Sequence, residues 1–232
     1  MRYPFLILDL NGTLVDTFDD LTDALNDQLH AMGRSTLSVE QVRLWPGENL
    51  RVILRAALAL TGPVPTDLEI SERLPDFRAG YEAHLGVRAY LYDGVAEVLQ
   101  ELTEAGVRMA VLTNKPLSPS LKVLQQMGIA SRFQYLLAGD SDVARKPDPE
   151  GLLTLVHQLS GESDARDRAL MVGSSRIDLH TARNAGVCCA LVDQDHSRAV
   201  HAMGADYVLD GISRLARLAL GTRPSGTWPI PQ

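Results

Sequence analysis

The stretch Phe5-Leu6-Ile7-Leu8-Asp9-Leu10-Asn11-Gly12-Thr13 decides the fold of this chain. Its four consecutive apolar residues predict a strand that is buried on both faces, as in a parallel sheet. Asp9 follows this run directly, so its carboxylate is expected at the carboxyl end of the strand, where open α/β sheets bind their ligands. A carboxylate there suits a nucleophile or a metal ligand. Asn11 stands where acid–base chemistry would call for a second carboxylate.

The rest of the chain alternates between strand-like and helix-like segments. Short apolar runs predict further strands at residues 108–112, 135–138, 169–172, 189–192 and 207–209, with helical periodicity between them. Leu121 is assigned to the apolar face of one of these helices, and Leu153 to that of another. This alternation is typical of an α/β fold, here a Rossmann-like three-layer core around a parallel sheet. Residues 17–88 show helical spacing and no strand pattern, which predicts an all-helical insertion after the first strand. We therefore predict a core of residues 1–16 and 89–220, a helical cap of residues 17–88, and a disordered tail at 221–232.

Composition excludes several classes of function. The net charge of −7 argues against binding to nucleic acid or to acidic membranes, and no apolar stretch is long enough to span a bilayer. Cys188 and Cys189 are adjacent and are not expected to form a disulfide, which fits a cytoplasmic protein, as does the absence of a signal-peptide pattern. The six histidines show no ligand spacing with carboxylate or cysteine partners, so no zinc site is expected.

Four groups of polar residues accompany the predicted strands. In a parallel sheet the carboxyl ends of the strands meet at one crevice, so these groups are expected to lie together. An attacking carboxylate, a hydroxyl–amide pair, an ammonium group and a second carboxylate suit an anionic substrate. The groups are Asp9 and Asn11; Thr113, Asn114 and Lys115; Lys146; and Gly173, Ser174, Ser175 and Asp178.

These motifs resemble those of the haloacid dehalogenase superfamily, and within it the phosphoglycolate phosphatase-like group with a small helical cap. Residues 9–16 (DLNGTLVD) resemble the first motif, Asp-x-Asp-Gly-Thr, and residues 113–116 (TNKP) resemble the second. Residues 145–149 (RKPDP) resemble the third motif, and residues 172–178 (VGSSRID) the fourth, usually Gly-Asp-Ser-x-x-Asp. The resemblance covers nearly the whole chain, and four motifs in order indicate the fold strongly.

The resemblance implies hydrolysis of a small anionic phosphate monoester through an aspartyl intermediate, with the protein a monomer or a homodimer. Asp9 would attack phosphorus, and Lys146 would balance the charge of the phosphoryl oxygens. The residue two positions after the nucleophile, here Asn11, normally protonates the leaving oxygen and then activates water. The substrate-binding residues implied by the resemblance are Thr113, Asn114, Lys115 and Gly12.

The resemblance also implies Mg²⁺ as cofactor, held by Asp9, the backbone carbonyl of Asn11, Ser174 and Asp178. Two of these positions depart from the family pattern, because Asn11 and Ser174 replace carboxylates. Two carboxylates and Lys146 sum to −1, against −3 for the usual set, so the affinity for Mg²⁺ should fall. Loss of the acid–base residue should by itself lower the rate by about 10² to 10⁴.

Three functions remain compatible with these departures. The first is a phosphatase-like hydrolase with a modified site. The second is metal-independent hydrolysis of a carbon–halogen bond, because superfamily dehalogenases lack the same two carboxylates, although they usually carry an aromatic residue at the position of Asn11. The third is a catalytically inactive protein that binds a small anion or a partner.

Structural roles are open for some of the same residues. Ser174 could be the N-cap of a helix. Asp178 could cap a helix, or could pair with Arg176 or Arg183.

Overall fold

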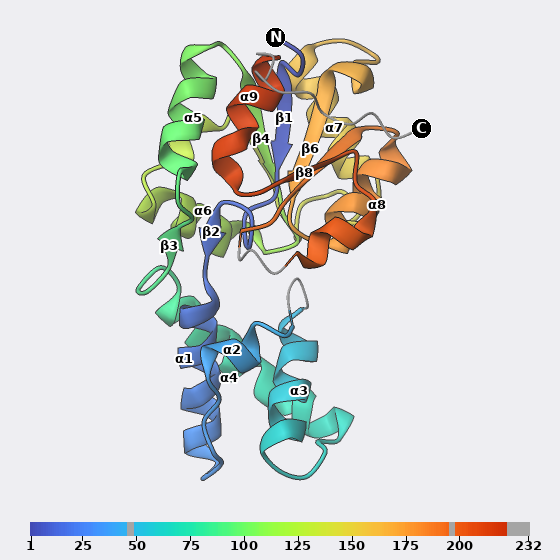
Figure 1. Cartoon of the computed structure of the whole chain (residues 1–232). Coiled ribbons are helices and arrows are strands. Elements are labelled where there is room, and N and C mark those ends of the chain that lie inside the picture. The colour runs from blue at the N-terminus through green and yellow to red at the C-terminus, as the bar shows by residue number, and fades with distance from the viewer. Residues whose placement is uncertain (46–48, 195–197, 222–232) are drawn as a thin grey trace.

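A six-stranded parallel sheet forms the centre of the computed structural model, which describes residues 1–45, 49–194 and 198–221 (Figure 1). The strand order is β5–β4–β1–β6–β7–β8, so the strand that ends at Asp9 lies between β4 and β6. The predicted α/β fold is confirmed. The strands are β1 (Phe5–Leu8), β4 (Arg108–Leu112), β5 (Tyr135–Leu137), β6 (Ala169–Gly173), β7 (Cys188–Val192) and β8 (Tyr207–Leu209).

Helices cover both faces of this sheet and give the core three layers. Successive residues of β1 face opposite sides: Ile7 belongs to the core cluster under α7 and α8, whereas Leu6 and Leu8 belong to the cluster under α5 and α9. All three side chains are fully buried, which explains the uninterrupted apolar run. The helices are α5 (Val95–Glu104), α6 (Leu117–Gln126), α7 (Glu150–Ser160), α8 (Arg176–Ala185) and α9 (Leu215–Leu220).

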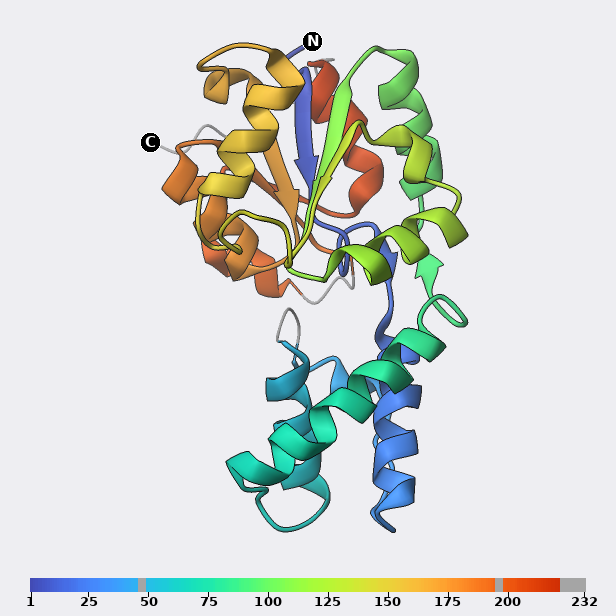
Figure 2. The same cartoon turned by 180° about the vertical axis from the view of Figure 1, so that it is seen from behind.

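A separate group of helices lies beyond the carboxyl edge of the sheet (Figures 1 and 2). It comprises α1 (Phe18–Ala31), α2 (Val39–Val42), α3 (Leu50–Thr61) and α4 (Asp67–His84), which we call the helical unit. Capping boxes at Ser38 and Thr66 begin α2 and α4. A two-stranded antiparallel ribbon, β2 (Val15–Asp16) with β3 (Tyr90–Leu91), connects the unit to the core.

Several details differ from the sequence predictions. The ribbon was not predicted, because two-residue strands are too short to show periodicity. On α6 and α7, Leu121 and Leu153 were assigned to the buried faces, but their side chains are 38% and 37% exposed. Residues 222–232 of the predicted tail lie outside the described residues. Short 3₁₀ helices complete the description: η1 (Ala130–Arg132), η2 (Arg166–Arg168), η3 (Ala199–Met203) and η4 (Ile212–Arg214).

Two expectations from composition can be compared with the structure. Cys188 and Cys189 are both free thiols. Within the described part of the chain, none of the helices combines the length and the apolar character that crossing a membrane requires.

Candidate active site

A buried ammonium group joins two carboxylates at the carboxyl edge of the sheet. Lys146 Nζ lies 2.8 Å from Asp9 Oδ1 and 2.6 Å from Asp178 Oδ1. The side chains of Lys146 and Asp178 are 4% and 0% exposed, whereas that of Asp9 is 13% exposed. The structure therefore brings together three of the predicted site residues and leaves the proposed nucleophile partly open to solvent.

Burial and the opposite charge nearby shift the pKa in opposite directions, both for Asp9 and for Lys146. The pKa of Asp9 is raised to about 6 by burial, against the lowering effect of the Lys146 ammonium, while the charge of Asp178 adds to the rise. Burial alone would lower the pKa of Lys146, but the two carboxylates outweigh it and raise that pKa to about 12. At neutral pH Lys146 is thus a fixed cation, and Asp9 is mainly ionised.

Asp178 is held by the start of α8 as well as by Lys146. Its Oδ2 accepts hydrogen bonds from the backbone N–H groups of Ser174 and Ser175 and from the Ser175 hydroxyl. The N-cap of α8 is Ser175, so the suggestion that Ser174 caps this helix is wrong by one position. The alternative that Asp178 caps a helix is confirmed, because it forms a capping box with Ser175. Its suggested pairing with an arginine is wrong, because Lys146 is its ion-pair partner. Both Asp178 oxygens are therefore occupied by protein donors.

The loop after β1 is tightly turned against Ser174. Gly12 has a φ of +77°, and a Cβ at this position would lie 2.9 Å from Ser174 Oγ. The Gly12 N–H donates to the carbonyl of Val15, so it is used within the turn rather than being free for a substrate. The hydroxyl of Thr13 donates to Ser174 Oγ over 3.3 Å. Gly12 therefore permits the close approach of two motif loops.

Asn11 belongs to a polar chain that reaches the helical unit. Its Nδ2 donates to Thr17 Oγ1 over 3.0 Å, and that hydroxyl lies 3.4 Å from the Tyr81 hydroxyl on α4. Lys115 Nζ donates to Tyr81 Oη over 2.8 Å from the other side. The Oδ1 atom of Asn11 is buried and has no hydrogen-bond partner among the described residues. A ligand with a donor group could satisfy this oxygen.

The residues after β4 play distinct parts. Thr113 is buried, and its hydroxyl accepts a hydrogen bond from the backbone N–H of Lys115. The side-chain amide of Asn114 makes two hydrogen bonds of 3.0 Å with the backbone N–H and carbonyl of Lys146. Both functional groups of Asn114 are thus engaged in fixing Lys146, where the resemblance implied contact with substrate.

The donors around Asp9 fit Mg²⁺ poorly. Hard divalent cations are held mainly by charged oxygen ligands. Asp178 has given both oxygens to protein donors, and Asp9 has given one to Lys146. Ser174 and Asn11 contribute only neutral oxygens. The triad of Asp9, Asp178 and Lys146 carries a net charge of −1, as expected from the sequence.

Comparisons with known proteins establish the family. The family model described as haloacid dehalogenase-like hydrolase matches residues 6–192. The chain belongs to this family. It is 35% identical over 221 residues to phosphoglycolate phosphatase 1 of Pseudomonas aeruginosa, covering 92% of this chain and 79% of that protein. It is 36% identical over 184 residues to phosphoglycolate phosphatase of Rhodobacter capsulatus, covering 79% and 81% of the two chains.

The fold of this haloacid dehalogenase-like hydrolase is also found in solved structures. A protein from Haemophilus somnus, described as a predicted phosphoglycolate phosphatase, superposes with a TM-score of 0.83 over 94% of this chain and 98% of that chain. A haloacid dehalogenase-like protein from Streptococcus pneumoniae gives a TM-score of 0.76, with 95% and 99% covered. Their identities of 24% and 20% support the fold alone. The resemblance to the phosphoglycolate phosphatase-like group is confirmed, because the curated relatives named phosphoglycolate phosphatase are 35% and 36% identical to this member of a hydrolase family.

Sequence reasoning missed two residues that touch the site of this hydrolase. Tyr81 contacts Lys115 and Thr17 from α4, but nothing in its sequence context distinguishes it from a core aromatic residue. Gln194, which follows β7, donates from Nε2 to the carbonyl of Thr13 over 2.6 Å. A position just past a parallel strand was the one available signal for Gln194.

Proposed function

We propose that this chain hydrolyses a phosphate monoester of a small anionic substrate, with Asp9 as the nucleophile. The contact of 2.8 Å between Asp9 and Lys146, at the edge of the sheet that faces the helical unit, carries this proposal. The partly exposed Asp9 carboxylate can reach a ligand, and the ammonium group lies where the charge of phosphoryl oxygens would need balancing. The names of the curated relatives support phosphate esters as the substrate class.

The proposed reaction has two displacements at phosphorus. An Asp9 oxygen forms a bond to phosphorus while the bond from phosphorus to the leaving oxygen breaks, and water then hydrolyses the aspartyl phosphate. Lys146 offsets negative charge in both steps. The Asn11 amide can donate a hydrogen bond to the leaving oxygen but cannot transfer a proton, so the leaving group takes its proton from solvent. We therefore expect slow turnover of alkyl phosphates and faster turnover of aryl phosphates, whose leaving groups need no protonation.

The remaining site residues are proposed as binding groups. Thr113 would bind phosphoryl oxygens, and Lys115 would attract the second anionic group of the substrate. Asn114 is proposed to act by positioning Lys146. Residues 17–88 would act as a cap that excludes water, since Tyr81 of α4 already contacts Lys115. We retain a reducing cytoplasmic location and a monomer or homodimer as parts of the proposal.

A second candidate is metal-independent hydrolysis of a carbon–halogen bond. Asn11 and Ser174 replace the two carboxylates that superfamily dehalogenases lack. The triad geometry favours it as well, because the Lys146 ammonium already neutralises one of the two carboxylate charges without a metal ion. In this reaction Asp9 would attack carbon, the carbon–halogen bond would break with release of halide, and water would hydrolyse the ester.

Two assays on the full chain separate these functions. The first measures phosphate release from para-nitrophenyl phosphate and 2-phosphoglycolate with Mg²⁺ and with EDTA, and the second measures chloride release from a 2-chloro acid with EDTA. Phosphate release that Asp9→Asn abolishes and the exposed control Asp142→Asn retains is the expected result. EDTA-insensitive chloride release would instead support the second candidate. Silence in both assays, with phosphate still raising the melting temperature, would indicate an inactive binding protein and contradict the proposal.

A further inference from the structure

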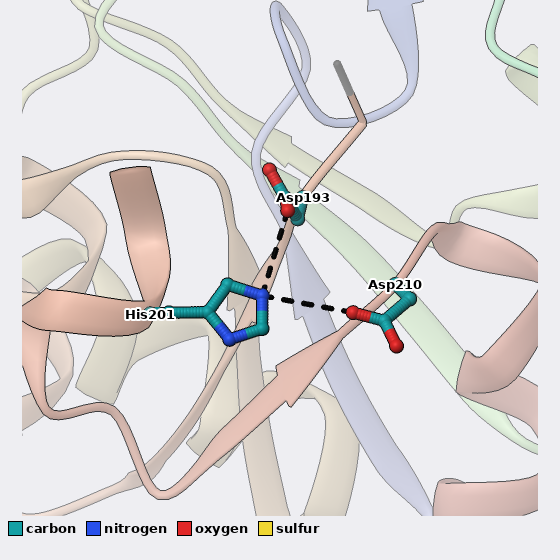
Figure 3. A group of neighbouring side chains, drawn as sticks. All are labelled: Asp193, His201 and Asp210. Carbon is teal, nitrogen blue, oxygen red and sulfur yellow. Dashed lines mark ion pairs between the residues drawn. The ribbon is translucent and has the colours of Figure 1, made fainter. Parts of the chain in front are cut away.

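A second group of ligand-type side chains converges at the edge of the sheet formed by β7 and β8. Asp193 directly follows β7, His201 lies in η3, and Asp210 directly follows β8. His201 Nε2 lies 3.5 Å from Asp193 Oδ2 and 3.6 Å from Asp210 Oδ1, so the imidazole nitrogen sits between two carboxylates (Figure 3). One donor atom from each residue lies within 4.8 Å of the other two.

Asp193 gives the independent indication that this group binds a ligand. Its side chain is only 3% exposed, and Oδ2 accepts a hydrogen bond from the backbone N–H of Arg198. Its Oδ1 is buried and has no hydrogen-bond partner among the described residues. A buried carboxylate oxygen without a partner is costly, because it has lost its hydration. Figure 3 shows Asp193 Oδ2 on the side of the His201 ring, with the second oxygen of the carboxylate on the far side.

We propose that Asp193, His201 and Asp210 bind a divalent transition-metal cation of the zinc class. One imidazole nitrogen and two carboxylate oxygens form a mixed N/O donor set of the kind that Zn²⁺ accepts, whereas Mg²⁺ and Ca²⁺ prefer oxygen alone. Two carboxylates and a neutral imidazole carry a charge of −2, which a divalent cation would balance. The His201 and Asp210 side chains are 43% and 75% exposed, so a cation can enter from solvent.

This cluster is separate from the triad around Asp9 but is connected to it through the backbone. Gln194, the neighbour of Asp193, donates to the carbonyl of Thr13 in the loop that follows the nucleophile. A cation bound by three segments would hold β7, η3 and β8 together and steady Gln194 against that loop. The site is thus structural, and it supplies no step of the proposed reaction.

The competing explanation is a protonated His201 that bridges the two carboxylates without any metal. A protonated His201 would leave the three groups with a net charge of −1, whereas a divalent cation would balance their charge of −2. Only the metal explanation predicts saturable binding of Zn²⁺. Because His201 and Asp210 are well exposed, His201→Gln and Asp210→Asn should leave the fold intact, which a thermal unfolding curve without metal would verify.

Isothermal titration calorimetry of the full chain with Zn²⁺, in excess Mg²⁺, tests the proposal. We expect one equivalent to bind the unchanged chain, Asp9→Asn, and His180→Gln, which alters an exposed histidine on α8. His201→Gln and Asp210→Asn should each weaken binding by at least about tenfold and remove the rise in melting temperature that Zn²⁺ causes. The proposal is overturned if the unchanged chain binds no Zn²⁺, if His201→Gln binds it equally well, or if Asp9→Asn abolishes binding.

Discussion

The positive charge of Lys146 reduces the repulsion between two carboxylates in a site that is largely buried from solvent. Its ammonium contacts Asp9 and Asp178, and Asn114 fixes its backbone from both sides. The two ion pairs offset the free-energy cost of removing the ammonium group from water. The charge of each carboxylate therefore depends on the presence of Lys146. This single side chain therefore determines both the charge and the geometry around the nucleophile.

Replacing Lys146 by Gln should destabilise the fold in a pH-dependent way. The free energy of unfolding should fall by about 3 kcal/mol at pH 8, because a buried ion-pair partner is lost. The loss should be smaller at pH 5, where Asp9 can take up a proton and remove one of the uncompensated charges. Urea unfolding at the two pH values measures this. Lys122→Gln, at a partly exposed lysine whose ammonium group donates to the carbonyl of Glu82, should change stability by no more than about 1 kcal/mol at either pH. An equal loss at both pH values for Lys146→Gln would contradict the account.

The raised pKa of Asp9 predicts an acid limit for catalysis. Only the ionised carboxylate attacks, and its pKa of about 6 means that kcat/KM should decline as the pH falls through that value. An unperturbed aspartate would retain its activity down to about pH 4. A pH profile with para-nitrophenyl phosphate gives the apparent pKa, which belongs to the coupled triad rather than to one residue. Full activity at pH 5 would show that burial does not govern Asp9.

Restoring the two missing carboxylates should increase phosphatase activity. Asn11→Asp returns a group that can transfer a proton, and Ser174→Asp adds a charged oxygen for Mg²⁺. The double variant should hydrolyse 2-phosphoglycolate with Mg²⁺ at least about tenfold faster than the unchanged chain, with each single variant gaining less. No gain in a double variant that unfolds at the same temperature would refute the role assigned to these positions.

At the scale of elements, the ribbon of β2 and β3 is organised around one buried carboxylate. Asp16 is 1% exposed, and its Oδ2 accepts hydrogen bonds from Arg43 at 2.5 Å, Tyr90 at 3.1 Å and Tyr92 at 3.2 Å. Burial raises the pKa of Tyr92, which keeps this phenol protonated as a donor. Arg43 directly follows α2 of the helical unit, whereas Tyr90 lies in the returning strand β3 and Tyr92 directly after it. Asp16 therefore connects the unit to the core.

Asp16→Asn should therefore lower the free energy of unfolding by about 3 kcal/mol, since Arg43 would keep its charge without a partner. The matched control is Asp67→Asn, which removes an 83% exposed carboxylate that pairs with Arg51 and Arg55. These exposed pairs should contribute no more than about 1 kcal/mol each. Chemical denaturation of both variants gives the comparison, and equal losses would mean that burial of Asp16 adds nothing.

Sequence patterns predicted the strands and helices of the core and missed the two-residue strands of the ribbon. The apolar runs located all six strands of the main sheet, most clearly β1 and β6, in which every residue is buried. The edge strands β5 and β8 are only partly buried, but their short apolar runs still indicated them. Periodicity placed the helices but assigned Leu121 and Leu153 to the wrong faces, because an apolar side chain can lie at the surface without penalty to the pattern. The N-cap of α8 was misplaced by one residue, since Ser174 and Ser175 are equally good caps.

For the site, sequence order predicted that Asp9, Lys146 and Asp178 meet, because all three follow parallel strands. It could not predict how they share hydrogen bonds, since Asn114 uses its amide on a backbone rather than on a ligand. Nor could it find the cluster of Asp193, His201 and Asp210, whose members are brought together by the pairing of β7 with β8. Such contacts depend on the pairing register of neighbouring strands, and this register cannot be read from the spacing of residues along the sequence.

Across the whole molecule, the helical unit and the core share a polar chain. Asn11 and Thr17 connect to Tyr81, which also accepts a hydrogen bond from Lys115. The chain runs from the loop of the nucleophile to α4, so the position of the helical unit is coupled to residues that face the substrate. Tyr81 is the one aromatic residue in this chain of contacts.

Tyr81→Phe should loosen this coupling while the ring keeps its packing. Loss of the hydroxyl should cost about 1 kcal/mol, which corresponds to a change of about fivefold in KM if the unit closes over bound substrate. Steady-state kinetics and thermal unfolding of the variant measure the two effects. Tyr135→Phe, at a half-exposed tyrosine of β5, is the control; an unchanged KM for Tyr81→Phe would show that the contact with Lys115 does not influence substrate binding.

The antiparallel pairing of Val15 with Leu91 and of Asp16 with Tyr90 has a consequence for how such proteins can diversify. The outgoing and returning strands are neighbours in one ladder, about 5 Å apart. The segment inserted between them therefore leaves the core and returns to it at nearly the same point. An insertion of this kind can be exchanged for another of different length without moving the main sheet. Transplanting residues 17–88 from a relative, together with a partner for Asp16, should thus graft a new substrate preference onto an unaltered reaction centre.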